Sequence, residues 1–170
     1  MVILFSDRKS KTEKEIIKIL MNCGVGYVSD KIINYSKNGL TVISEYKPTA
    51  LNVKRGIAVI TENTARFEKQ FFPKGIIGIC ESENKNALKV FENNKTPVIT
   101  CGMNPKSTVT FSSINSDSIL LSLQRTVKGI NRTETEPQEI KIKLNGKYET
   151  FSVMASAVIL LLYGKKPTEF

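Results

Sequence analysis

Polar side chains that could bind or transform a ligand follow four apolar segments of the chain. These segments, at residues 2–5, 56–60, 75–80 and 97–100, are short and apolar, so each is expected to form a buried strand. If the four strands are parallel neighbours, the residues after them share one edge of the sheet, where open α/β sheets bind ligands. The candidate ligand-binding residues at this edge are Asp7, Glu62, Asn63, Glu81, Glu83, Cys101 and Asn104.

The carboxylates in this set could serve as general acids or bases, with the Cys101 thiol beside them. Such a site requires two carboxyl groups in one concave pocket and a shifted pKa on at least one of them. Cys101 precedes Gly102, so its side chain could be exposed, and Lys106 is a cation that could stabilise a thiolate. The other interpretation of Cys80 and Cys101 is that both are packed, apolar-like side chains at strand ends.

Several kinds of chemistry are excluded by residues that the chain lacks. The sequence contains no histidine, which removes Ser-His and Cys-His nucleophiles and most zinc sites. Three scattered cysteines cannot form a Cys₄ zinc site, and they favour a reducing compartment over a disulfide scaffold. No window fits the Walker phosphate loop, because the segment 102–108 has the Lys-Ser pair without the required glycines. We therefore predict no metal and no cofactor.

The chain carries a formal net charge of +9, which raises the question of nucleic acid. The lysines are spread throughout the sequence, and the longest basic runs are pairs such as Lys54-Arg55 and Lys165-Lys166. Arginine, the better phosphate ligand, is scarce. A lysine-rich background composition explains the charge better than a nucleic-acid interface.

The elements expected to position the candidate residues alternate between strands and helices. The segment Ser10–Glu13 has the form of a capping box, and the apolar spacing after it predicts a helix that stops near Gly24. Further helices are predicted over residues 64–72 and 84–91. This alternation predicts a single α/β domain over residues 1–170, a three-layer sandwich with a mainly parallel sheet.

Other segments predict antiparallel pairing and one buried helix. An Asn38-Gly39 turn predicts a hairpin between residues 32–36 and 40–46. Strands over 108–113, 118–123 and 139–144 predict an antiparallel extension of the sheet. Residues 151–163 predict a helix that is apolar nearly all round, whose small residues suit a core or a dimer contact, with the core favoured.

The opening residues 1–5 are too few for a signal peptide, and the apolar stretch 151–163 is too short for a membrane span. These features predict a cytoplasmic protein that does not span a membrane.

The segment from about Gly75 to Gly164 resembles the second half of the central domain of Mur-type peptide ligases. Residues 75–80 with the helix 84–91, the strand 97–100 ending at Gly102, and Met154–Ala157 after Gly146 carry the resemblance. The phosphate loop of that family has no counterpart. Residues 148–151 replace its Gly-His-Asn element, and Glu81-Ser82-Glu83 replaces its Asn-Asp pair. The resemblance implies a related fold and a link to cell-wall metabolism, and no catalytic residue is transferred.

Three functions follow as hypotheses. The first is a non-catalytic binding or regulatory protein on a Mur-ligase-like scaffold, whose partner is a small ligand or a protein, with a homodimer as one possibility. The second is an enzyme with a carboxylate and thiol site at the strand ends. The third, nucleic-acid binding through the basic surface, is the least favoured.

Overall fold

The computed structural model of the chain describes residues 1–7, 10–29, 31–36, 39–45, 51–62, 67, 69–131 and 133–170. Asn63, the turn residues 37–38 and residues 64–66 and 68 of the helix predicted over 64–72 lie outside these residues. The described residues of that segment, 67 and 69–72, form no α-helix. The helices are α1 (Lys11–Asn22), α2 (Lys85–Asn93) and α3 (Thr150–Leu162). The strands are β1 (Val2–Phe5), β2 (Gly26–Val28), β3 (Ile33–Asn34), β4 (Thr41–Glu45), β5 (Gly56–Ile60), β6 (Ile76–Glu81), β7 (Val98–Cys101), β8 (Val109–Ile114), β9 (Ser118–Leu123), β10 (Val127–Lys128), β11 (Glu134–Thr135) and β12 (Gln138–Lys143).

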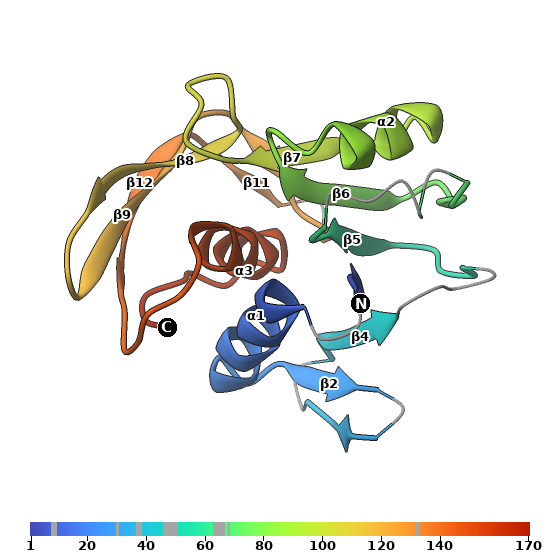
Figure 1. Cartoon of the computed structure of the whole chain (residues 1–170), viewed down its shortest axis with the longest axis horizontal. Coiled ribbons are helices and arrows are strands. Elements are labelled where there is room, and N and C mark those ends of the chain that lie inside the picture. The colour runs from blue at the N-terminus through green and yellow to red at the C-terminus, as the bar shows by residue number, and fades with distance from the viewer. Residues whose placement is uncertain are drawn as a thin grey trace.

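The strands form one large mixed sheet with helices on both faces, which confirms the predicted three-layer α/β fold. Ten strands lie in the order β12-β9-β8-β7-β6-β5-β1-β4-β2-β3, and β10 pairs with β11 in a separate ribbon. Helices α1 and α3 cover one face, and α2 covers the other (Figure 1). The buried apolar residues form two clusters, the larger of which includes α1 and α3 and the smaller of which includes α2.

The parallel part of the sheet brings the predicted strand ends together. Strand β1 pairs in parallel with β5, β5 with β6, and β6 with β7. Because neighbouring parallel strands point the same way, their carboxyl ends meet at one edge, which we call the carboxyl edge. The central strands β1 and β5 are buried along their whole length, as strands covered on both faces must be.

Beyond β7 the sheet continues with the predicted antiparallel extension. Strand β9 pairs antiparallel with β8 and with β12. In β12, Ile140 and Ile142 are buried, whereas Lys141 and Lys143 are exposed, so the alternation seen in the sequence marks a strand with one face on the core.

Side-chain caps fix the starts of α1 and α2. Ser10 Oγ accepts a hydrogen bond from the amide of Glu13 at 3.1 Å, as the capping-box pattern predicts. Asn84 Oδ1 accepts from the amide of Ala87 at 2.9 Å. These caps satisfy amide donors that the first turn of a helix leaves free.

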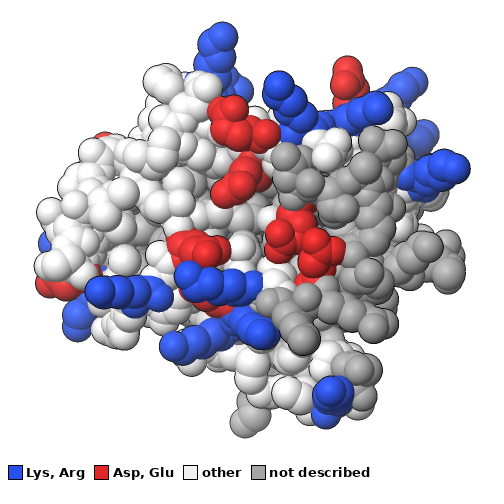
Figure 2. Space-filling model, in the orientation of Figure 1, with Lys and Arg blue, Asp and Glu red and all other residues white. Residues whose placement is uncertain are grey.

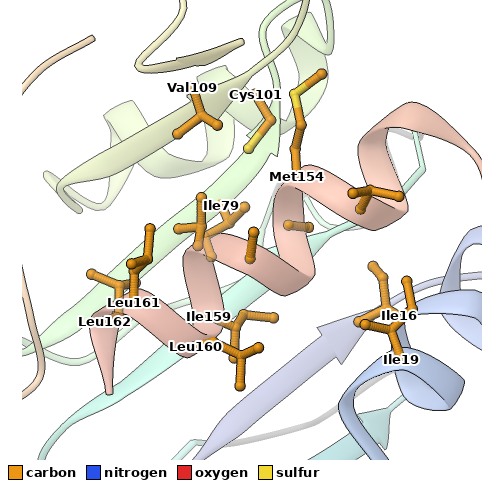
Figure 3. Packing of buried hydrophobic residues seen from close by; sticks show 14 of the residues in the cluster. Ile16, Ile19, Ile79, Cys101, Val109, Met154, Ile159, Leu160, Leu161 and Leu162 are labelled. Atoms are coloured by element: carbon orange, nitrogen blue, oxygen red, sulfur yellow. The ribbon is translucent and has the colours of Figure 1, made fainter. Parts of the chain in front are cut away.

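Helix α3 has no polar face. Every residue from Phe151 to Leu162 is buried, so the core interpretation of its small residues is confirmed and they are not available for a dimer contact. Figure 3 shows its side chains directed both toward Ile79 on the sheet and toward Ile16 and Ile19 of α1. No helix in the described part of the chain combines the length and apolar character that a membrane span requires.

The predicted hairpin between residues 32–36 and 40–46 is wrong. Strand β3 pairs antiparallel with β2, and β4 pairs in parallel with both β2 and β1. Gly39 does adopt a positive φ of 69°, and its amide donates to the carbonyl of Ser36. The two arms do not pair with each other, because the buried Val42 places β4 against β1 in the core.

Candidate functional site

A cavity of about 300 Å³ lies at the carboxyl edge, beyond the ends of β6 and β7. We call it the edge cavity. It is lined by Glu81, Ser82, Glu83, Cys101, Gly102, Met103, Asn104, Thr150, Phe151 and Met154. Four of the candidate residues from the sequence, Glu81, Glu83, Cys101 and Asn104, therefore share one hollow, and the start of α3 supplies a wall that the sequence did not reveal.

The two glutamates that line the cavity are both exposed residues. Burial raises the pKa of Glu81, and the nearby charges of Glu149 and Glu62 raise it further. Each of these effects disfavours the ionised form of the Glu81 carboxyl. Of the requirements stated for an acid/base site, the structure thus shows a shifted pKa on Glu81 and two glutamates that line one cavity. Both glutamates are exposed, and a convergence of their carboxyl groups stays a prediction.

Cys101 lines the cavity but is fully buried, so the expectation that it could be exposed is wrong. It packs in the core cluster with Val109 and Met154, and Figure 3 shows the Met154 side chain directed from α3 toward it. Burial raises the pKa of Cys101 well above its usual value, and the charges of Cys80 and Glu81 add to this. Burial likewise raises the pKa of Cys80 to about 12. Both thiols match the packed interpretation and are poor nucleophiles at neutral pH.

The loop after β7 is held in place by its own hydrogen bonds. Asn104 Oδ1 accepts from the amide of Lys106 at 2.9 Å. Gly102 is needed because a Cβ at this position would lie 2.2 Å from Ser82 Oγ. The loop is thereby packed closely against the residues that follow β6.

Two other candidate residues lie outside the cavity wall. Glu62 accepts a hydrogen bond from Ser10 Oγ at 2.5 Å, and its carbonyl accepts from Asn84 Nδ2 at 3.1 Å. Glu62 therefore connects the first residues of α1 and α2. Asp7 follows β1 and makes other interactions, and it does not line the edge cavity.

A polar cluster that the sequence did not reveal links the starts of α1 and α3. Thr12 Oγ1 donates to Glu149 Oε2 at 2.8 Å, and Lys11 Nζ lies 3.1 Å from Glu149 Oε1. The amide of Glu149 donates to Glu15 Oε2 at 2.7 Å. The hydrogen bonds from Thr12 and Lys11 lower the pKa of Glu149. The spacing Lys11–Glu15 was a visible signal, but the contact with Glu149 spans most of the chain.

The start of α1 can be compared with the strand–loop–helix unit of a P-loop. Strand β1, the loop 6–10 and α1 form a strand–loop–helix unit, and α1 begins with Lys11-Thr12. In a P-loop, a Lys-Ser/Thr pair at this position follows a glycine and contacts phosphate and magnesium. Here Ser10 stands in place of the glycine, and the carboxylate of Glu149 binds the side chains of Lys11 and Thr12.

Carboxylates gather over the middle of the face shown in Figure 2, with lysine and arginine side chains mainly around them. The charges of Glu62 and Glu149 both act on Glu81 and raise its pKa. No group of three potential metal ligands occurs among the residues that the structure describes. Among the described residues, three glutamates thus lie near one another at the carboxyl edge of a chain whose net charge is +9.

No protein-family model matches the sequence, and no curated protein sequence matches it. A solved structure is similar: the UDP-N-acetylmuramate:L-alanyl-γ-D-glutamyl-meso-diaminopimelate ligase from Neisseria meningitides. The two chains are 13% identical with a TM-score of 0.58, and the match covers 99% of this chain and 62% of the ligase. The fold is therefore Mur-ligase-like. The structural likeness extends beyond residues 75–164, and the assignment of that segment to one half of a domain stays a prediction.

Proposed function

We propose that this chain is a non-catalytic binding or regulatory protein, built on a Mur-ligase-like fold, whose ligand binds at the carboxyl edge. The observation that carries the proposal is the Glu149 carboxylate bound to Lys11 and Thr12. A negatively charged group at that position repels a phosphate, and it uses the two side chains that a P-loop would direct to the nucleotide.

The loop before α1 supports the same conclusion. Phosphate binding at a helix start depends on backbone amides that approach the ligand closely, and glycines make that approach possible. Residues 6–10 read Ser-Asp-Arg-Lys-Ser, without a glycine and with an aspartate. Hydrolysis of a nucleotide is therefore not the activity that this edge favours.

The proposal is tested by nucleotide binding and turnover. Purified protein is expected to hydrolyse no ATP, and ATP or ADP with magnesium is expected to leave its melting temperature unchanged. The variant Glu149→Ala removes the internal carboxylate while keeping Lys11 and Thr12. Stabilisation of that variant alone by nucleotide would show that Glu149 blocks the site, whereas reproducible ATP turnover by the natural sequence would refute the proposal.

A link to cell-wall metabolism is part of the proposal, and it rests on the likeness to a ligase named for UDP-N-acetylmuramate. Because that likeness concerns the fold, the link needs a direct test. Thermal-shift measurements with UDP-linked cell-wall precursors would support the link if one of them stabilises the protein. We also propose a cytoplasmic location, supported by the three cysteines, which form no disulfide.

A second candidate function is an enzyme that uses Glu81 as a general acid. It is favoured by one observation, the raised pKa of Glu81 in a cavity that it shares with Glu83. Loss of a measured activity in Glu81→Gln, with the fold unchanged, would separate this candidate from a binding protein. Nucleic-acid binding stays a prediction, and a gel-shift experiment at low salt tests it.

A further inference from the structure

We propose that Asn145 is a site of spontaneous deamidation, that the segment packed beside it slows the reaction, and that the reaction loosens this segment. The segment comprises residues 167–170, and we call it the docked segment. Two features of the structure meet here: an exposed Asn-Gly pair, and a hydrogen bond from the asparagine side chain to the docked segment. This chemistry is independent of the proposed function.

Asn145 and Gly146 lie in the loop between β12 and α3, and both residues are exposed. Asparagine is a thermally labile residue, because the backbone nitrogen of the next residue can attack its side-chain amide. A glycine at the next position hinders this attack least, since it has no side chain. Among the described residues, the Gly146 amide donates no backbone hydrogen bond, so its nitrogen is not held in another contact.

The reaction needs water as its one co-reactant. The nitrogen of Gly146 forms a bond to Cγ of Asn145, and the bond between Cγ and Nδ2 breaks. The proton of the Gly146 amide leaves with Nδ2 as ammonia, and a succinimide ring remains. Water then opens the ring at either carbonyl carbon, which gives an aspartate or an isoaspartate at position 145. A cavity of about 400 Å³, lined in part by Asn145, Thr168 and Glu169, gives water access to this amide.

The docked segment is attached to the end of β12 by backbone hydrogen bonds. The amide of Lys143 donates to the carbonyl of Thr168 at 2.9 Å, and the amide of Phe170 donates to the carbonyl of Lys143 at 2.8 Å. The amide of Asn145 donates to the carbonyl of Phe170. Phe170 is 2% exposed and belongs to the larger core cluster, so docking of the segment also buries apolar surface.

The side chain of Asn145 is part of this attachment. Its Nδ2 donates to Oε1 of Glu169 at 2.9 Å, and Lys143 Nζ lies 3.6 Å from the same oxygen. The hydrogen bond from Asn145 is the largest cause that lowers the pKa of Glu169, and the charge of Lys143 adds to it. The nitrogen that departs in the reaction is therefore the donor that binds the docked segment.

The reaction and the docking oppose each other. Because Nδ2 must leave Glu169 before it departs as ammonia, docking slows the reaction. The product carries a carboxylate, which accepts hydrogen bonds but cannot donate one, and its charge repels that of Glu169. Lys143 stays beside both groups and limits this repulsion. An isoaspartate also adds one methylene group to the backbone of the short loop that leads to Glu149.

The reaction itself is measured by incubating the purified protein at pH 7.5 and following each asparagine by mass spectrometry of its peptides. We expect Asn145 to react in the folded protein, and Asn22, which lines the same cavity but precedes Cys23, to stay intact. The variant Gly146→Ala should slow the reaction severalfold. It should fold normally, because the nearest atom to an added Cβ is 3.4 Å away.

Variants of Glu169 test whether docking slows the reaction. Glu169→Ala removes the acceptor and should raise the rate at Asn145 by about two- to fivefold, as for an exposed charged contact. Glu169→Gln keeps an acceptor oxygen and should have an intermediate rate. Glu134→Ala, which removes an exposed carboxylate paired with Lys128, is the control and should leave the rate unchanged. An intact Asn145 in folded protein, while guanidinium-unfolded protein reacts at this pair, or an equal rate in Glu169→Ala, would overturn the proposal.

The variant Asn145→Asp shows the effect of the product on the docked segment. Hydrogen exchange at the Phe170 amide should be about two- to fivefold faster than in the natural protein, and exchange in β5 should be unchanged. Cys23 Sγ lies 4.0 Å from the carbonyl of Glu169, so its reaction with iodoacetamide should also become faster. Equal exchange at Phe170 in the two proteins would overturn the proposal. None of these measurements contains a nucleotide, so their failure is distinct from ATP turnover.

Discussion

Thr12 Oγ1 donates a hydrogen bond of 2.8 Å to Oε2 of Glu149, across 137 positions of the chain. Glu149 is the N-cap residue of α3, yet its side chain makes no capping bond to that helix. Its carboxylate instead binds Lys11 and Thr12 at the start of α1. The contact therefore joins the two helices of one face at their first turns, next to the edge cavity.

This contact predicts a measurable coupling between the two residues. In a double-mutant cycle with Thr12→Val and Glu149→Gln, the coupling free energy of unfolding should be about 1 kcal/mol, because a hydrogen bond to a partly exposed charged group contributes on that order. Urea unfolding of the four proteins measures it. Additive effects of the two substitutions, with no coupling, would contradict the geometry.

The pKa of Glu81 should respond to its acidic neighbours. A ¹³C carboxyl titration by NMR is expected to give a value above 4.5 for Glu81, and Glu149→Gln should lower it by removing one like charge. Burial, the largest cause, stays in that variant, so part of the shift should remain. An unchanged Glu81 titration in Glu149→Gln would show that the two carboxylates do not interact.

The same shift predicts how Glu81 affects stability with pH. Because folding raises the pKa of Glu81, its ionised form disfavours the folded state, and this penalty appears as the pH rises through the raised pKa. The variant Glu81→Gln should therefore stabilise the protein at neutral pH and lose this advantage in acid. Urea midpoints at pH 7 and at pH 4 test the sign, with Glu92→Gln as the control.

Gly102→Ala should destabilise the fold by about 1–3 kcal/mol, because the added methyl group would overlap Ser82 Oγ. The variant Ser82→Ala removes that oxygen. In the Ser82→Ala background the cost of Gly102→Ala should fall, and thermal unfolding of the four proteins measures the difference. The same cost in both backgrounds would place the clash elsewhere.

The three cysteines should differ in their reaction with iodoacetamide. Cys80 and Cys101 are buried with raised pKa values, whereas Cys23 is partly exposed. Burial also raises the pKa of Cys23, so its reaction should be slow, but it should still precede the other two. Mass spectrometry of the labelled peptides identifies the order. Early labelling of Cys101 in the folded protein would contradict its buried position and would support a role of this thiol as a nucleophile.

The elements that the sequence predicted correctly are those whose signals are local. The helix starts at Ser10 and Asn84 depend on residues within the next turn of the chain. The buried strands and the alternation in Ile140–Lys143 likewise follow from residues close together in the sequence. The pairing of strands, in contrast, is not determined by local sequence. Gly39 adopts the positive φ that an Asn-Gly turn requires, but whether β4 pairs with β3 or with β1 depends on the packing of the whole sheet.

For the candidate site, too, the sequence predicted the local features and missed the long-range contacts. The rule that parallel strands share an edge correctly brought Glu81, Glu83, Cys101 and Asn104 to one cavity. It could not separate Glu62, whose side chain accepts from Ser10, from the residues that line the wall. The contributions of Phe151, Met154 and Glu149 were invisible, because α3 reads in the sequence as an undifferentiated apolar helix.

The position of α3 has a consequence for how the chain is made. This helix lies near the end of the sequence, yet its twelve buried residues complete the larger core cluster against α1 and the sheet. Residues 150–162 are synthesised after all the other helices and strands. The sheet face that they cover therefore stays exposed in the nascent chain until α3 has left the ribosome. Truncated translation products that end before α3 would therefore be substrates for chaperones and proteases.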